Sequence, residues 1–132
     1  MAQQKKRVCD VIAAVGWQFA EALPTVAEEL PEKKFLFIDN VMNGSLDNEM
    51  SIVYAQNEGS FLVGYIAGKL SKTGKVGVVG GQDSETINDF IVGYEAGAKY
   101  ANPDCAVEVQ YANDFEDPAK GKECALALYG LG

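Results

Sequence analysis

The run that decides the fold extends from Asn57 to Glu123 and centres on residues 75–81, KVGVVGG, a β-branched strand that ends in a double glycine. A glycine-studded helix precedes this strand, and an amphipathic helix, a second strand and an acidic segment at 114–117 follow it. Strands that alternate with helices in this order form a parallel sheet that helices cover. Polar residues stand just past the strand ends, which is where open parallel sheets bind small ligands.

The same alternation continues toward the N-terminus. Short apolar runs bounded by turn residues predict strands at 9–15, 34–39, 50–55, 75–81 and 107–111. Helical spacing predicts helices at 17–29, 59–71, 85–101 and from 118 onward, with a kink or a separate first turn caused by Pro24. The strand at 34–39 is apolar on both faces, as parallel strands covered by helices are. The order β-α-β-β-α-β-α-β-α indicates a three-layer α/β/α fold with a mostly parallel sheet.

The two central helices each carry a pair of glycines four residues apart, Gly64 with Gly68 and Gly93 with Gly97. We expect these small residues to let the helix axes approach a sheet closely. Charged residues interrupt both segments, which argues against a membrane-helix dimer. The double glycine at 80–81 has two interpretations, a tight strand-to-helix turn or a turn that offers backbone N–H groups to a ligand at a helix N-terminus.

Composition narrows the function classes. With 132 residues, 48% of them hydrophobic, the chain fits one globular domain with a real core. A net charge of −8 disfavours phosphate backbones and anionic lipid surfaces, so we expect no nucleic-acid partner. The sequence has no histidine, which excludes Ser-His-Asp and Cys-His catalysis and His-ligated zinc.

Neither the cysteines nor the glycines form a motif for a metal or a cofactor. The three cysteines, Cys9, Cys105 and Cys124, have no CxxC spacing, and we expect them to be buried free thiols. The phosphate-loop, dinucleotide and G-x-S-x-G patterns are all absent. We therefore expect no catalytic residue, no cofactor and no metal.

Two features near strand ends each allow a structural and a functional interpretation. Trp17, the single tryptophan, follows Gly16 at the end of the first strand, where it either closes the core or stacks on a planar ligand. In the acidic segment, Asp117 precedes Pro118 and predicts a helix N-cap, with a cation site as the weaker alternative. The carboxylates at the start of the helix at 85–101 suit the helix dipole without any function.

Four blocks, in the right order and at the right spacing, resemble the basic membrane protein family. The blocks are NEGSFLVGYIAG at 57–68, TGKVGVVGG at 73–81, FIVGYEAGAK at 90–99 and FEDPAKGKE at 115–123. DVIAAVGW at 10–17 and FLFID at 35–39 also match the family's rhythm. The family resembles the purine-nucleoside receptor lipoproteins, which are the substrate-binding subunits of ABC importers.

The resemblance implies a periplasmic-binding-protein type I fold, in which two α/β lobes close on a nucleoside through a hinge. It places residues 1–54 in the first lobe and 55–132 in the second, with Gln56–Glu58 in a hinge crossover. The alternative is a single flavodoxin-like domain over 1–132. The resemblance further implies no enzymatic activity, an ABC permease as partner of the full-length relative, and a membrane-anchored extracellular or periplasmic location. This chain shows a basic start without a long apolar segment, so we expect it to be cytoplasmic as expressed.

The family's proteins are longer, and we expect this chain to be an internal fragment or a shortened relative. Only the turn at 16–18 falls where a family pocket residue would lie. The candidate ligand-binding residues are Trp17, Gln18, Asn57, Asp83 and Asn113. The leading hypothesis is a solute-binding module for a purine nucleoside or a similar solute. The alternatives are a self-associating fragment without ligand binding and a small α/β enzyme.

The longer proteins of the family have end segments that cap the edges of their sheets. We expect this chain to lack those segments and therefore to self-associate. An apolar strand such as Phe35–Ile38 or Val76–Val79 should then lack a neighbour, and an exposed strand edge recruits another copy.

Overall fold

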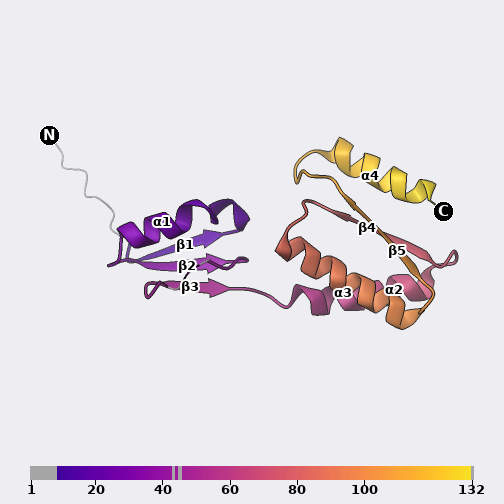
Figure 1. Cartoon of the computed structure of the whole chain (residues 1–132), viewed down its shortest axis with the longest axis horizontal. Coiled ribbons are helices and arrows are strands. Elements are labelled where there is room, and N and C mark those ends of the chain that lie inside the picture. The colour runs from indigo at the N-terminus through magenta and orange to yellow at the C-terminus, as the bar shows by residue number, and fades with distance from the viewer. Residues whose placement is uncertain (1–8, 43, 45, 132) are drawn as a thin grey trace. The chain divides into compact units, whose positions relative to one another are not determined.

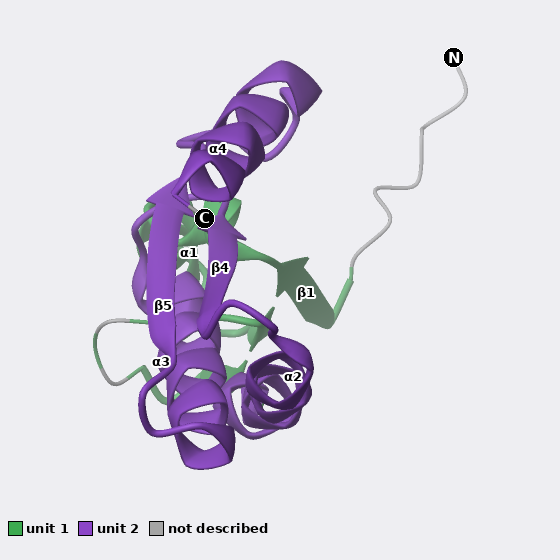
Figure 2. Cartoon of the chain, turned by 90° about the vertical axis from the view of Figure 1, so that its right-hand side faces the viewer, with its two compact units in different colours: residues 1–54 green, residues 55–132 purple. Residues whose placement is uncertain are grey.

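The computed structural model describes residues 9–42, 44 and 46–131, so the basic start of the chain, Asn43, Ser45 and Gly132 lie outside the described part (Figure 1). The chain divides into two compact units, Met1–Tyr54 and Ala55–Gly132 (Figure 2). The elements follow the predicted β/α order, and every strand pair is parallel in the described residues. The fold class is α/β, as predicted.

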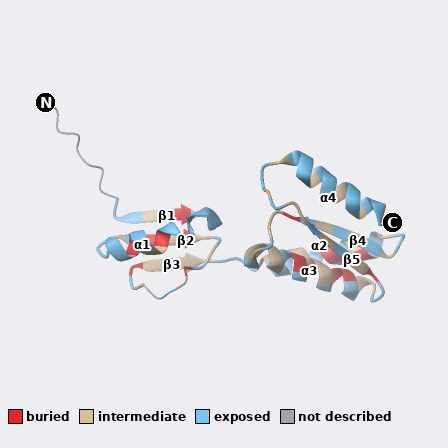
Figure 3. Cartoon of the chain, turned by 45° about the horizontal axis from the view of Figure 1, so that its top comes forward, coloured by how far each residue is buried: buried red, intermediate tan, exposed pale blue. Residues whose placement is uncertain are grey.

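The first unit is a three-stranded parallel sheet with one helix packed on it. Its elements are β1 (Val11–Val15), η1 (Trp17–Phe19), α1 (Ala22–Glu29), β2 (Lys34–Ile38) and β3 (Glu49–Ile52), with strand order β1-β2-β3. Alternate residues of the strands face α1, and Phe35 and Phe37 of β2 are almost completely buried there against Leu23 and Ala27. Figure 3 shows this small core in red. Of the two outcomes predicted for this segment, a kink or a separate first turn, the structure has the separate turn, because η1 ends at Phe19 and α1 begins at Ala22. Pro24 lies in the first turn of α1, where its missing N–H has no helical acceptor to lose.

The opposite face of this sheet is also apolar but remains open to solvent. Val11 and Val15 of β1 are 61% and 59% exposed, and Met50 of β3 is 64% exposed. Leu36 stands on the same face, since it pairs with Ala13 on one side and with Met50 on the other. The two-faced apolar pattern predicted for 34–39 is therefore present, although α1 covers only one of the two faces.

One buried polar side chain joins the sheet to α1. The amide of Asn48, which is 9% exposed, donates to the carbonyl oxygens of Ala27 at 2.9 Å and Leu30 at 3.2 Å. These carbonyls belong to the last turn of α1, where helices leave backbone acceptors without an internal donor. Asn48 therefore caps α1 from the segment that leads into β3.

The second unit has three layers. Its elements are α2 (Gln56–Leu70), β4 (Lys75–Gly80), α3 (Glu85–Ala101), β5 (Ala106–Tyr111) and α4 (Pro118–Gly130), and β4 pairs with β5 in a two-stranded parallel sheet. Figure 1 shows α2 and α3 on one side of this sheet and α4 on the other. Asp117 caps α4 by accepting from the N–H groups of Ala119 and Lys120, which confirms the predicted N-cap.

The glycine pairs join two helices to each other and not to a sheet. A Cβ built at Gly64 of α2 would lie 1.9 Å from the Tyr94 carbonyl oxygen of α3, and one at Gly97 of α3 would lie 1.9 Å from that of Phe61 of α2. Gly68 and Gly93 meet the partner helix's backbone in the same way. The expectation of a close approach is correct, but its partner was wrong, because spacing within a helix does not say which surface the small face meets.

Two further expectations need correction. The strand Phe35–Ile38 has a neighbour on each side, since β2 lies between β1 and β3, so it offers no free edge. Of the cysteines, Cys105 is buried and Cys124 is partly buried, but Cys9 is exposed because β1 begins only at Val11.

Candidate functional site

The carboxyl ends of β4 and β5 bring two predicted site segments to one edge of the second unit's sheet. Asp83 follows β4 and Asn113 follows β5, and both side chains are exposed. Backbone hydrogen bonds tie the two turns together, from Ala112 N–H to the Gly80 carbonyl at 2.9 Å and from Asp114 N–H to the Gly81 carbonyl at 3.0 Å. Neighbouring parallel strands place their following loops at the same edge, where α/β sheets bind ligands.

The double glycine of this edge makes room for two aromatic rings. A Cβ at Gly80 would lie 2.9 Å from the Tyr111 ring, and one at Gly81 would lie 2.2 Å from the Phe115 ring. Neither glycine has a positive φ. Glycine is therefore needed at both positions because the rings of Tyr111 and Phe115 approach the backbone closely. The tight-turn interpretation does not explain these two glycines.

A polar chain that the sequence did not reveal orients Asp83. The Tyr111 hydroxyl donates to the Asn88 Oδ1 at 2.6 Å, and the Asn88 amide donates to the Asp83 carboxylate at 2.8 Å. Tyr111 thereby fixes which end of the Asn88 amide faces Asp83. The three residues come from β5, α3 and the β4–α3 loop, so sequence separation hid their contact.

A shallow hollow of about 330 Å³ opens beside this edge, at the N-terminus of α4. Its lining combines the Gly80–Gly81 turn, the Phe115 ring, which is 52% exposed, and the carboxylates of Asp114 and Asp117. Asp83 and Asn113 lie on the same edge but do not line this hollow. The hollow thus brings an aromatic ring and two carboxylates together at one edge of the sheet.

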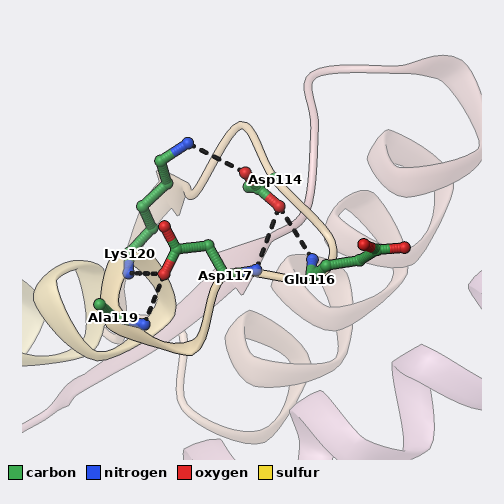
Figure 4. A network of polar contacts seen from close by, with 5 residues as sticks. All are labelled: Asp114, Glu116, Asp117, Ala119 and Lys120. Atoms are coloured by element: carbon green, nitrogen blue, oxygen red, sulfur yellow. Dashed lines mark hydrogen bonds and ion pairs between the residues drawn. The ribbon is translucent and has the colours of Figure 1, made fainter.

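Backbone N–H groups and one lysine hold the acidic segment in place (Figure 4). Asp114 accepts from Glu116 N–H at 2.9 Å and Asp117 N–H at 3.1 Å, and the Lys120 ammonium lies 3.0 Å from its other oxygen. These hydrogen bonds lower the pKa of Asp114 to about 2. The largest contribution comes from the Glu116 N–H, and smaller ones come from Lys120 and the Asp117 N–H. In turn, the Asp114 carboxylate raises the pKa of Lys120. The cluster is occupied by its own turn, and no group of three metal-ligating side chains occurs within 9–42, 44 and 46–131.

In the first unit, Trp17 and Gln18 follow β1 at the carboxyl edge of the three-stranded sheet. Trp17 is 48% exposed and does not belong to the core cluster, so it does not close the core. The backbone turns at Gly16, whose φ is 93°, and the Gln18 amide folds back to 2.6 Å from the position of a Gly16 Cβ. Only glycine adopts this turn freely, and it leaves both side chains at the solvent-facing edge.

Asn57 is not placed in a loop. The second unit's first helix begins at Gln56, three residues earlier than predicted, so Asn57 lies in the first turn of α2. Its carbonyl oxygen lies against Gly93 of α3, and the residue lines a separate hollow of about 320 Å³ together with Phe61 and Val92. The structure therefore does not bring Asn57 to the strand-end edge where Asp83 and Asn113 lie.

A family model described as ABC transporter substrate-binding protein PnrA-like matches residues 1–132. The chain belongs to this family. The predicted relationship to basic membrane proteins is confirmed, and it covers all of the blocks on which the prediction rested.

No helix within the described ranges is both long and apolar enough to cross a bilayer.

Known relatives of this PnrA-like chain are much longer. It is 39% identical over 122 residues to Basic membrane protein A of Borreliella burgdorferi, covering 91% of this chain and 36% of that protein. It is 38% identical over 122 residues to the ABC transporter nucleoside-binding protein BmpA of Lactococcus lactis, covering 92% of this chain and 34% of that protein. A crystal structure of an ABC transporter solute-binding protein from Aeropyrum pernix K1 matches with TM-score 0.84 and 32% identity, over 93% of this chain and 36% of that chain. The chain spans about a third of the length of these relatives.

Proposed function

We propose that this chain is part of a solute-binding protein that recognises a purine nucleoside or a chemically similar small solute and binds it without chemical turnover. The observation that carries the proposal is the family match over 1–132, together with a nucleoside-binding relative at 38% identity. The solute is handed to an ABC permease by a longer, membrane-anchored protein that acts outside the cytoplasm. On this proposal, residues 1–54 and 55–132 are portions of that protein's two lobes.

Exposed side chains at strand ends supply the ligand contacts. Trp17 offers a half-exposed indole for stacking on a planar base, which is worth roughly 1–3 kcal/mol per base. Gln18 offers an amide beside it. In the second unit, Asp83 and Asn113 offer hydrogen-bonding groups that suit ribose hydroxyls or base edges. Asn57 is the weakest candidate, because its helix places it away from that edge.

The chain alone should bind nucleosides weakly. With a third of a relative's length, it supplies only some of the contacts, and each hydrogen bond to a charged group that is absent costs about 1.5–3 kcal/mol. Isothermal titration calorimetry with inosine, guanosine and adenosine tests this expectation. We expect binding weaker than micromolar, and sub-micromolar binding would show that the remaining segments are not needed.

The absence of turnover is tested on the same nucleosides. Incubation with the chain, followed by chromatography, should return each nucleoside unchanged, whereas release of a free base would establish an enzyme.

We also propose that the chain associates with copies of itself. The support is the unpaired edge that β4 presents in the described residues and the large number of exposed apolar side chains.

A further inference from the structure

Three hydrogen-bonded side chains cross the strand-end edge of the second unit, from the half-buried Tyr111 to the exposed Asp83. The register pairs Tyr111, the last residue of β5, with Gly80, the last residue of β4. A Cβ at Gly80 would lie 2.9 Å from the Tyr111 ring and 3.0 Å from Ile87 of α3. The missing side chain thus lets the ring lie beside α3, where its hydroxyl reaches Asn88.

The direction of these hydrogen bonds follows from the carboxylate at one end. An ionised carboxylate only accepts, so the Asn88 amide must turn its NH₂ group to Asp83 and its oxygen to Tyr111. The tyrosine hydroxyl can donate to that oxygen, and the distances of 2.8 Å and 2.6 Å are those of good hydrogen bonds. Each bond therefore fixes the orientation of the next group.

Asn88 itself has little freedom to move. Its backbone N–H donates to the Ser84 carbonyl at 2.8 Å, so the residue belongs to the regular first turns of α3. Its side chain is half-buried and is bonded through both of its polar atoms. An exposed carboxylate ordinarily exchanges rapidly among rotamers, whereas Asp83 is tied to a group that stays in place.

The bond between Asp83 and Asn88 does not cap α3. The N-cap residue is Ser84, which makes no side-chain capping bond, and the donor to Asp83 is a side chain. That bond uses Oδ1, and Asp83 remains exposed. Within the described part of the chain, no hydrogen bond reaches Oδ2. This second oxygen is therefore available at the edge where α/β sheets bind ligands.

We propose that Asn88, held by the Tyr111 hydroxyl, is a positioning residue that keeps Oδ1 of Asp83 on the protein and presents Oδ2 to a donor group of the solute. The inference rests on the proposed function, because Asp83 is a residue of the proposed site. A side chain that is already fixed loses little conformational freedom when the solute binds, which strengthens binding.

NMR of the full chain without any ligand tests the positioning. The three-bond couplings about the Asp83 Cα–Cβ bond should correspond to one staggered rotamer in the unsubstituted chain. Asn88→Ala should average these couplings over several rotamers, and Tyr111→Phe, which keeps the ring beside Gly80, should average them in part. Asn102→Ala is the matched control, because it removes an asparagine at the other end of α3. Averaged couplings in the unsubstituted chain, or unchanged couplings in Asn88→Ala, would overturn the proposal.

An exchange of the two side chains separates the hydrogen bond from the shape of the residues. Asn88→Asp keeps the size of the side chain and an acceptor for Tyr111, but it sets a second carboxylate against Asp83, so the couplings should average. The double variant Asp83→Asn/Asn88→Asp restores a donor and an acceptor in reversed order, and the single rotamer should return. Failure of this rescue would contradict the role of the hydrogen bond.

Titration of the full chain with inosine, followed through the Gly80 and Gly81 amide resonances, tests the consequence for binding. Asn88→Ala should raise the dissociation constant roughly three- to tenfold. The same substitution in an Asp83→Asn chain should add little, because its effect acts through Asp83. Equal effects in both backgrounds would overturn the proposal and leave Asn88 a structural role. Resonances that do not shift in the unsubstituted chain would remove the proposed solute contact at this edge, and the rotamer couplings would still decide whether Asn88 positions Asp83.

Discussion

At the scale of single residues, several glycines of the second unit lie where a side chain would overlap the backbone of the neighbouring helix. Gly64 meets the Tyr94 carbonyl where no side chain fits, whereas Gly59 in the same helix has nothing within 4 Å of a built Cβ. The two positions share a helix and differ in this contact. They therefore separate the intrinsic cost of glycine in a helix from its value in packing.

We predict that Gly64→Ala destabilises the second unit and that Gly59→Ala stabilises it. The alanine at Gly64 forces α2 and α3 apart, and overpacking of this kind costs about 1–3 kcal/mol. At Gly59 the helix gains roughly 0.5–1 kcal/mol because alanine loses less backbone entropy. Urea unfolding followed by circular dichroism at the helix band measures both. Equal effects of the two substitutions would contradict the interlocked packing of the helices.

The Asp114 carboxylate gives a residue-scale prediction about pH. Its pKa in the folded chain is about 2, below the ordinary 3.8, so it favours the folded state above pH 4 and loses that contribution as pH falls toward 2. NMR titration of the carboxyl carbon should show the low midpoint. Lys120→Met should raise this pKa only part of the way, because the Glu116 and Asp117 N–H groups remain. A midpoint near 3.8 in the unsubstituted chain would refute the hydrogen-bonded turn.

At the scale of elements, the end of α1 depends on a side chain from another segment. Asn48 donates to two carbonyls of the last turn and is buried beside them. Removing this buried donor takes away the Ala27 carbonyl's partner, which costs about 1–3 kcal/mol, whereas the Leu30 carbonyl still accepts from the Lys33 N–H at 3.0 Å. These two bonds link α1 to the residue that precedes β3.

We predict that Asn48→Ala lowers the stability of the first unit by about 1–3 kcal/mol. Asn48→Asp should be worse, since it replaces the donor with a negative charge facing the carbonyl oxygens. Trp17 fluorescence during urea unfolding reports on this unit. Asn40→Ala is the control, because the Asn40 side chain accepts only from the adjacent Val41 N–H among the hydrogen bonds described. A loss no larger than that of the control would show that Asn48 is not the cap.

Element boundaries were predictable where pattern and punctuation agree. The helix at 85–101 and the Asp117 cap appear as predicted, because the helix has a regular apolar stripe and the cap precedes a proline. The start of α2 was missed, since no capping side chain marks it. Two features could not be predicted, because they depend on which elements become neighbours. They are the hydrogen bonds that join Tyr111, Asn88 and Asp83, and the helix that each glycine pair meets.

At the scale of the whole molecule, the apolar surfaces agree with the family relationship. The open face of the first sheet and the free edge of β4 both belong to strands that are rich in apolar residues. Parallel strands with this composition are usually covered on both faces. The relatives are roughly three times as long as this chain, which spans 34–36% of their length. Our central proposal is that this chain is part of a nucleoside-binding protein of that length.

The most direct test is the nucleoside affinity of a chimera. The segment of the Lactococcus lactis nucleoside-binding relative that aligns with this chain is replaced by residues 9–131, and calorimetry measures inosine, guanosine and adenosine binding. We expect the chimera to bind a nucleoside that the unaltered relative binds, and Asp83→Asn in the chimera to weaken this binding roughly tenfold. A chimera that unfolds cooperatively like the relative but binds none of the three nucleosides would contradict the account.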